Sequence, residues 1–335
     1  MTLKKMIMQR KYLLNISCLL SLLLGMMACQ EEEYAIPAAK TNLQNDGIKR
    51  TLGPNLVGLD MEFAYAMALP ASKGKLVSAQ VEASIAGAAG TYLENHSYYT
   101  NGSGQDVGVK IGEPSVVEGK ITRVTFTEDT SAATLRYYYV IPEEARGKSV
   151  TFHFSATSSN GEKVSYAMGP YAIAKMDMVL DLAVKDGDAC YISIADMAVY
   201  KAADAPANAA KIDLVYLYRS IPNISFAHAL VSPAADPMYL PGVTLPAGVN
   251  RSTKVSKVWN LRDQHLARLQ YGIFIDDLDF QQLDLSNAPN YAVNLKAEAG
   301  TWVETADGKY KAYIYLNKVD NTNKSAQISI KRYAL

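Results

Sequence analysis

Apolar and polar residues alternate with a period of two along much of the chain from Leu56 onward. Residues 77–85 and 150–157 show this alternation most regularly, and glycine-containing turns separate such runs. The turns are Ser72-Lys73-Gly74, Glu118-Gly119, Ala145-Arg146-Gly147 and Ser159-Asn160-Gly161. A period of two is typical of half-buried antiparallel strands, and short strands joined by turns at this spacing predict a β-sandwich. We expect an immunoglobulin-like topology class only, because no Cys…Trp…Cys pattern is present.

A second set of strand-like runs follows a predicted domain boundary near residues 174–177. Residues 221–249 contain five prolines and are predicted to form a long connection. Residues 261–269 combine spaced leucines with helix-forming residues and predict a short amphipathic helix. The predicted fold is mainly β: an N-terminal immunoglobulin-like β-sandwich at residues 56–175, then a second β-rich, sandwich-like domain with a short helix at residues 176–335.

The first 28 residues have the order of a secretory signal peptide. Four basic residues precede an apolar run that begins at Tyr12 and ends at Ala28. The basic residues are Lys4, Lys5, Arg10 and Lys11. The run is shorter than the roughly 20 residues that span a bilayer, and polar residues interrupt it. Residues 1–28 are therefore predicted to be a signal, and residues 29–55 an acidic tether that leads into the fold.

Cys29 stands at the predicted first position after the signal, followed by Gln30, Glu31, Glu32 and Glu33. A cysteine in this position resembles the acylated residue of bacterial lipoproteins. The acidic run resembles the surface-export signal of Bacteroidetes lipoproteins. The resemblance implies lipidation at Cys29, a membrane partner through the lipid anchor, and a location on the cell-surface side of the outer membrane. The alternative is a secreted protein in which Cys29 is incidental. Met26 favours this alternative, because lipoprotein signals usually carry leucine at the third position before the cysteine.

Charge and cysteine content exclude several classes of protein. The chain has 33 basic and 33 acidic residues, and loss of the signal leaves 29 basic and 33 acidic, a net charge of −4. Because no basic excess remains to neutralise phosphates, a nucleic acid partner is not expected. Cys18 lies in the signal, so an acylated Cys29 would leave Cys190 without a partner for a disulfide. We expect Cys190 to be buried in a strand.

The residues that would support metal binding or catalysis are scattered. His96, His153, His228 and His265 lack metal-ligand spacing, and no G-x-S-x-G motif is present, so no metal, cofactor or catalytic residue is predicted. The densest acidic cluster is Asp276, Asp277, Asp279 and Asp284. Such carboxylates could serve a glycosidase or bind calcium, but the order of an EF-hand loop is missing. A solvated turn after the predicted helix is favoured.

Tyrosine is unusually abundant, with 22 residues against 7 phenylalanines and 2 tryptophans. Tyrosine and tryptophan can stack on sugar rings or contact protein partners, although tyrosine also favours strands for structural reasons. Tyr98 and Tyr99 lie in a predicted polar, glycine-rich loop at residues 96–104, where burial is not expected. With Trp259 and Trp302 they are the candidate ligand-binding residues. In the run from Tyr137 to Tyr139, alternation predicts Tyr138 on the face opposite its two neighbours.

Three segments of the mature chain resemble an uncharacterised group of two-domain Bacteroidetes surface lipoproteins. They are residues 29–33, Lys211-Ile212-Asp213-Leu214-Val215-Tyr216 and Asp307-Gly308-Lys309-Tyr310. The resemblance implies membership of a surface system that captures glycans, with an outer-membrane transport protein as a partner. We therefore expect a surface-exposed outer-membrane lipoprotein that acts as a non-enzymatic binding module for glycans. The alternative is a fimbrial or adhesive structural protein.

Overall fold

The computed structural model describes residues 39–335. The predicted signal, Cys29 and the acidic run at residues 30–33 lie outside these described residues. Within residues 39–335, no helix is long and apolar enough to cross a membrane.

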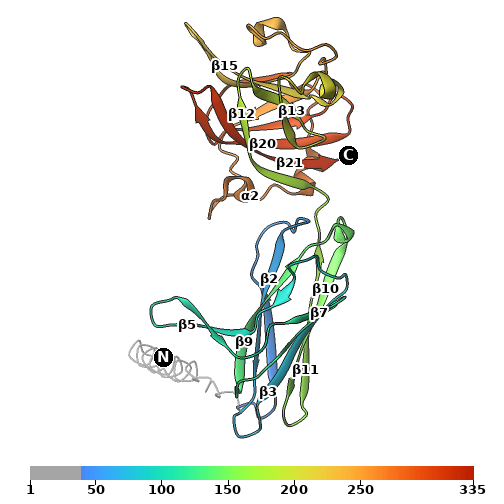
Figure 1. The fold of residues 1–335 in the computed structure, drawn as a ribbon, viewed down its shortest axis with the longest axis vertical. Helices are drawn as coiled ribbons and strands as arrows, with labels where there is room; N and C mark the ends of the chain where they lie inside the picture. Colours follow the sequence, from blue (N-terminus) through green and yellow to red (C-terminus); the bar gives the residue numbers. More distant parts are fainter. Residues whose placement is uncertain (1–38) are drawn as a thin grey trace, which may run out of the picture. The chain divides into compact units, whose positions relative to one another are not determined.

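Two antiparallel sheets form the first domain (Figure 1). The four-stranded sheet has the order β1 (Gln44–Lys49), β2 (Asp60–Ala68), β9 (Ala132–Val140) and β4 (Tyr92–Leu93). The five-stranded sheet has the order β11 (Lys163–Ala172), β10 (Ser149–Ser158), β3 (Leu76–Ala83), β8 (Ile121–Thr125) and β7 (Val116–Glu118). Strand β1 lies within the segment predicted as a tether, and it pairs with β2 along its whole length.

The core of the first domain lies between its two sheets and is rich in aromatic rings. Phe63 on β2 lies 4.7 Å from Phe152 on β10, measured between ring centroids. Tyr65, Tyr137 and Tyr139 are also buried there. Every second residue of β2, β9 and β10 is buried, as a period of two requires of strands with one covered face. The predicted β-sandwich is therefore confirmed.

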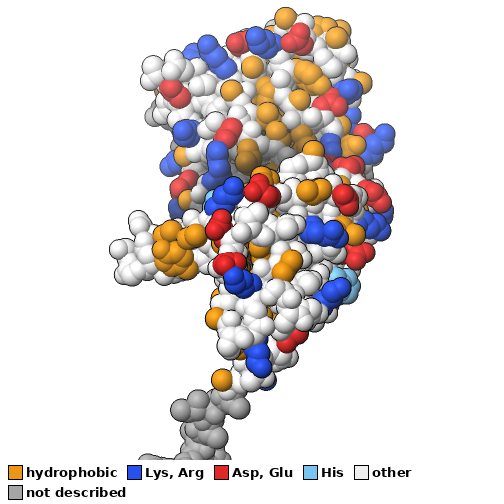
Figure 2. Space-filling view, turned by 60° about the horizontal axis from the view of Figure 1, so that its bottom comes forward, with side chains coloured by type: hydrophobic (Ala, Val, Ile, Leu, Met, Phe, Trp, Pro, Cys, Tyr) orange, Lys and Arg blue, Asp and Glu red, His pale blue; other side chains and the backbone are white. Residues whose placement is uncertain are grey.

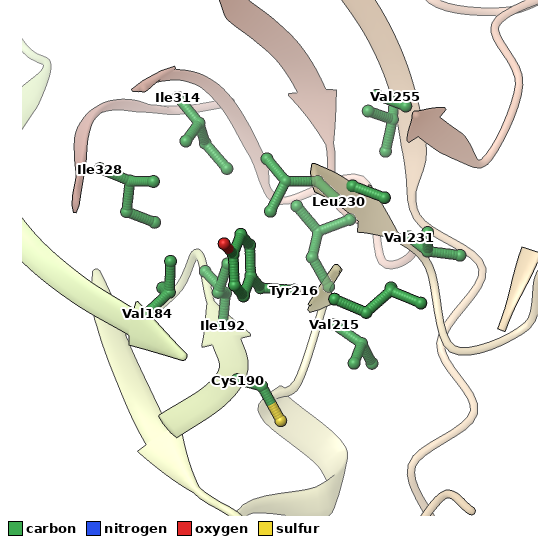
Figure 3. Packing of buried hydrophobic residues seen from close by; sticks show 14 of the residues in the cluster. Val184, Cys190, Ile192, Val215, Tyr216, Leu230, Val231, Val255, Ile314 and Ile328 are labelled. Carbon is green, nitrogen blue, oxygen red and sulfur yellow. The ribbon is translucent and has the colours of Figure 1, made fainter. Parts of the chain in front are cut away.

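The second domain likewise contains two antiparallel sheets, and here both sheets have five strands. One has the order β12 (Asp177–Lys185), β21 (Ser325–Ala334), β20 (Tyr310–Asp320), β19 (Gly300–Glu304) and β17 (Lys254–Val258). The other has the order β14 (Ala198–Lys201), β13 (Ala189–Ser193), β15 (Leu214–Ile221), β16 (Ile224–Val231) and β18 (Tyr291–Leu295). Their facing side chains form the larger core, in which Tyr216, Leu230, Ile314 and Ile328 lie close together (Figure 3).

Two short helices, α2 (Gln264–Ala267) and α3 (Asp277–Gln282), supply the residues that cover the outer face of β20. Leu266 and Phe280 pack there against Tyr313 and Tyr315. Six consecutive residues of β20 are consequently buried, because both faces of this strand are covered. Within the described part of the chain, 3₁₀ helices also lie at Glu143–Ala145, Pro206–Lys211 and Pro237–Tyr239.

Two sequence-based boundaries differ from the structure. The predicted helix at residues 261–269 is only the four-residue α2, because Asp263 caps its start and Arg268 adopts a left-handed conformation (φ 52°) at its end. The predicted proline-rich connection contains strand β16, which lies between β15 and β18. None of the five prolines falls within that strand, so its backbone donors remain available for the ladder.

Candidate functional site

A two-stranded hairpin, β5 (His96–Thr100) and β6 (Asp106–Lys110), follows β4 at the edge of the four-stranded sheet. The hairpin projects from the first domain (Figure 1). Asn101 closes the turn, since its Oδ1 accepts hydrogen bonds from the backbone of Ser103 and Gln105, both at 3.0 Å. The sequence predicts a loop here. The structure corrects this, because residues 96–100 pair in register with residues 106–110.

Strand pairing sends the adjacent Tyr98 and Tyr99 to opposite faces of the hairpin. The Tyr98 ring lies against Gly108, where an added Cβ would be 3.1 Å from Tyr98 Cε1. The guanidinium carbon of Arg136 lies 4.2 Å from the centroid of the same ring. Tyr99 is 55% exposed and faces away from this contact. The two tyrosines predicted together therefore belong to different surfaces.

Tyr98 joins two further tyrosines on the outer side of the four-stranded sheet. Tyr92 on β4 and Tyr138 on β9 are cross-strand partners. Their rings stack with centroids 4.8 Å apart and an interplanar angle of 16°. Tyr92 is 41% exposed, while Tyr98 and Tyr138 are half-buried. We call Tyr92, Tyr98 and Tyr138 the tyrosine face.

Charged side chains form a network beside the tyrosine face. Arg136 pairs with Asp106 and lies 3.7 Å from the Glu62 carboxylate. Arg50 pairs with Glu62 at 2.9 Å and lies 3.9 Å from Asp106. Each arginine therefore faces both carboxylates. In Figure 2 the hairpin is a projecting lobe that carries hydrophobic side chains, and acidic and basic side chains lie side by side where it joins the domain.

The tyrosine hydroxyls are protonated at neutral pH, and their surroundings raise their pKa further above it. Burial, with the negative charge of Glu94 second, raises the pKa of Tyr92 to about 12. Burial also raises the pKa of Tyr98 and of Tyr138. A hydrogen bond from Thr100 and the Arg136 ion pair lower the pKa of Asp106. A neutral phenol both donates and accepts hydrogen bonds, whereas a carboxylate with a depressed pKa is a poor proton donor.

The two predicted tryptophans belong to the second domain. Trp259 follows β17, is 48% exposed, and has Lys257 Nζ 4.5 Å from its ring centroid. Trp302 on β19 is half-buried, with its ring 4.6 Å from Tyr313 and 5.5 Å from Phe280. Trp302 therefore packs in the cluster beneath α3. Neither residue contributes to the tyrosine face.

The acidic cluster has a structural explanation. Asp276 caps α3, and its carboxylate accepts from the backbone of Leu278 and Asp279. Asp277 accepts from the backbone of Lys175 and Met176. Asp276, Asp277 and Asp279 therefore lie at the start of a helix and not in the predicted turn, while Asp284 follows α3 and accepts from the backbone of Ser286 at 2.8 Å. Within residues 39–335, no group of three or more potential metal ligands comes together.

Cys190 is buried at 5% exposure, as predicted. Burial raises the pKa of its thiol to about 11. A thiol with such a raised pKa is a poor nucleophile at neutral pH.

Sequence reasoning missed Tyr92 and Arg136, and it left the face of Tyr138 undecided. The available signal was the alternation within β9, which places Arg136 and Tyr138 together, opposite the buried Tyr137 and Tyr139. Tyr92 carried no such signal, because β4 is only two residues long.

Comparison of the chain with known proteins identifies its family. A family model described as a domain of unknown function, DUF4466, matches residues 40–173. A second model, DUF8576, also described as a domain of unknown function, matches residues 174–335. A crystal structure of a DUF4466 family protein from Parabacteroides merdae is 50% identical, with 89% of this chain and 100% of that chain covered and a TM-score of 0.84. The chain belongs to the DUF4466 family.

The tyrosine face and the β5–β6 hairpin both lie within residues 40–173, the part of the chain that matches DUF4466.

Two pilin structures were also found. The 35 kDa C-terminal fragment of the major pilin GBS80 of Streptococcus agalactiae is 13% identical, with 47% of this chain and 66% of that chain covered and a TM-score of 0.27. The major pilin subunit BcpA of Bacillus cereus is 9% identical, with 85% and 62% covered and a TM-score of 0.29. None of the curated proteins matches the chain.

Proposed function

We propose that this DUF4466 protein is a surface-exposed outer-membrane lipoprotein that binds glycans through its tyrosine face and catalyses no reaction. The observation that carries the proposal is the stacked pair of Tyr92 and Tyr138, whose rings lie on the outer side of a sheet instead of in the core. Aromatic rings present flat apolar surfaces, and the hydroxyls of tyrosine add polar edges. A sugar ring has the complementary combination of an apolar face and a hydroxyl rim.

The surroundings of the tyrosines support binding without catalysis. Glu62 and Asp106 are both engaged by Arg50 and Arg136, and the Asp106 pKa is lowered. A glycosidase of the common type needs one carboxyl group with a raised pKa to protonate the leaving group. The sequence features of the leader support the proposed lipid anchor at Cys29, its place in the outer membrane and an outer-membrane transport partner.

A glycan array with soluble residues 30–335 tests the proposal. We expect binding that Tyr92→Ala and Tyr138→Ala each weaken about tenfold, since stacking on aromatic rings contributes on the order of 1 kcal/mol beyond area burial. Trp302→Ala tests whether the packed tryptophan contributes to glycan binding. Tyr99→Ala, on the opposite face of the hairpin, serves as a control that should leave the affinity unchanged. An array without any ligand, or binding that both tyrosine variants retain in full, would contradict the proposal.

An adhesive or fimbrial role is the second candidate, and one observation favours it. The face of the hairpin that carries Tyr99 also carries Val107 and Val109, and Tyr99 and Val109 are at least half exposed. Exposed aromatic and apolar groups on a projecting element suit contact with a protein. This role predicts that Tyr99→Ala and Val109→Ser reduce cell adhesion or assembly while glycan binding is unaffected.

A further inference from the structure

We infer that the tyrosine face selects uncharged sugar rings over uronic acids, with Glu62 and Asp106 as the specificity-determining residues. This inference rests on the proposed glycan binding and concerns the charge of the ligand. Both arginines beside the face, Arg50 and Arg136, already have carboxylate partners.

A ligand carboxylate would find no unneutralised positive charge on these two arginines. Arg136 is 15% exposed, pairs with Asp106 and approaches Glu62, while Arg50 pairs with Glu62. The four charges of this network cancel, which leaves no unpaired cation in it. Arg136 also lies over the Tyr98 ring, so that the ring covers one side of the guanidinium group.

The remaining charge beside the tyrosines is negative. Glu94 precedes β5, and its charge contributes to the raised pKa of Tyr92, Tyr98 and Tyr138. Its carboxylate lies 3.5 Å from His96 Nδ1. A ligand carboxylate stacked on Tyr92 would therefore approach an anion without gaining a free cation. Like charges a few ångströms apart repel measurably even in water.

An uncharged sugar meets the opposite situation. Its hydroxyl groups can donate to the carboxylates of Glu62 and Glu94 and accept from the phenol groups. Hydrogen bonds to a charged partner are stronger than those between neutral groups. Glu94, which repels a uronic acid, and Glu62, which neutralises the arginines, therefore both provide hydrogen-bond acceptors for a neutral pyranose.

The first test compares matched ligands that differ only in charge. Isothermal titration with oligogalacturonate, oligoglucuronate and oligomannuronate, each beside its methyl ester, is run together with the array ligands on wild-type protein. We expect every ligand that Tyr92→Ala weakens to be uncharged, and each methyl ester that binds to bind at least tenfold more tightly than its acid. Acids that bind as tightly as their esters, and are lost in Tyr92→Ala, would overturn the inference while leaving the proposed function intact. Absence of every ligand would overturn both.

A second test removes the selecting charges. The double variant Glu62→Gln with Asp106→Asn leaves both arginines without carboxylate partners. It should reduce the preference for the ester about tenfold, because removal of two unit charges that each act on the ligand carboxylate from roughly 6 Å in water has about this effect. The matched control is Glu82→Gln with Glu118→Gln, which removes two exposed carboxylates from β3 and β7 of the other sheet. An unchanged preference in the first variant, with a melting temperature near that of wild type, would overturn the inference.

A salt series on the wild-type protein avoids any dependence on the stability of a variant. The screening length falls from about 30 Å at 0.01 M salt to about 3 Å at 1 M. Discrimination between ester and acid should consequently shrink severalfold over this range, while the affinity for the ester stays nearly constant. Discrimination that is independent of salt would mean that shape, not charge, selects the ligand, and would overturn the inference.

Discussion

Lys331 Nζ donates a hydrogen bond to Asp263 Oδ2 at 2.6 Å, and neither side chain is exposed to solvent. Lys331 lies on strand β21, and Asp263 is the residue that caps the start of α2. Asp263 also accepts from the backbone of Leu266 and Ile275, while Lys331 donates to the carbonyl of Ile275 at 2.8 Å. This buried pair joins the segment around α2 to the sheet beneath it.

We expect Lys331→Met to destabilise the protein by about 3 to 5 kcal/mol, because it leaves the Asp263 carboxylate buried without its counterion. Urea denaturation followed by circular dichroism measures this. The double variant Lys331→Met with Asp263→Asn should recover part of the loss, since the amide oxygen still caps α2 and no charge remains buried, while the backbone N–H of Ile275 loses its carboxylate acceptor. Equal loss in both variants would show that packing, and not charge, is responsible.

Stability should fall as the pH is lowered from about 6.5 to 4 because of His265. Burial, with the nearby positive charge of Lys331 second, lowers the pKa of His265 to about 4. The unfolded chain binds this proton near pH 6.5, whereas the folded chain binds it only near pH 4. The free energy of unfolding therefore decreases as the pH falls from 6.5 to 4, and His265 causes no further decrease below pH 4. The shift corresponds to about 3 kcal/mol at most. Urea midpoints of wild type and His265→Phe should differ in pH dependence within this window, and parallel curves would argue against a buried neutral histidine.

Tyr137 and Tyr138 are adjacent, and we expect opposite results from their substitution. Tyr137 is 1% exposed among Phe63, Phe152 and Phe154, so Tyr137→Ala should cost about 3 to 5 kcal/mol. Tyr138→Ala should cost less than about 1 kcal/mol and should weaken glycan binding instead. Thermal denaturation and titration calorimetry on both variants check this. Joint loss of stability and affinity in Tyr138→Ala would assign that residue to packing.

Cys29→Ser should abolish metabolic labelling with a fatty acid and release the protein from the membrane fraction. The physical reason is that the thiol of Cys29 is the expected attachment point of the acyl chains, and serine has no thiol to carry them. Cys190→Ser is the matched control, since that thiol is buried. Unchanged labelling of Cys29→Ser would contradict the lipoprotein assignment.

Replacement of Glu31, Glu32 and Glu33 by alanine should leave labelling intact and reduce digestion by protease added to whole cells. The reason is that the acidic run resembles a surface-export signal. Replacement of exposed acids in the folded domain, Glu82 and Glu118, provides the control for charge alone. Equal digestion of all three proteins would mean that the run is only a solvated tether.

Local pattern is sufficient to predict much of the fold. The period of two alone places Phe63, Val81 and Phe154 on covered faces, because alternation is a property of each strand by itself, and all three side chains are buried. Short or irregular strands escape such a pattern. Residues 44–49 lack an apolar stripe, and the two residues of β4 are too few to show a period.

The candidate site is predictable only in part, since the sequence singles out Tyr98 but not its partners. Tyr98, Tyr92 and Tyr138 meet because a hairpin, an edge strand and a central strand come together, and that pairing depends on contacts distant in sequence. The separation of Tyr98 from Tyr99 likewise depends on residues 96–100 forming a strand and not a loop.

The sequence by itself determined which strand residues share a face, since alternation depends on residues near one another in the chain. The leader and the absence of catalytic or metal-binding residues stay predictions from the sequence. Only the tertiary structure decided which of the faces are open to solvent and which charges are paired. Asp263 and Lys331 are 68 positions apart, and Arg136 and Asp106 are 30 apart. Nothing local marks such residues as partners, because the free energy that pairs them arises only when the sheets, helices and hairpin pack together.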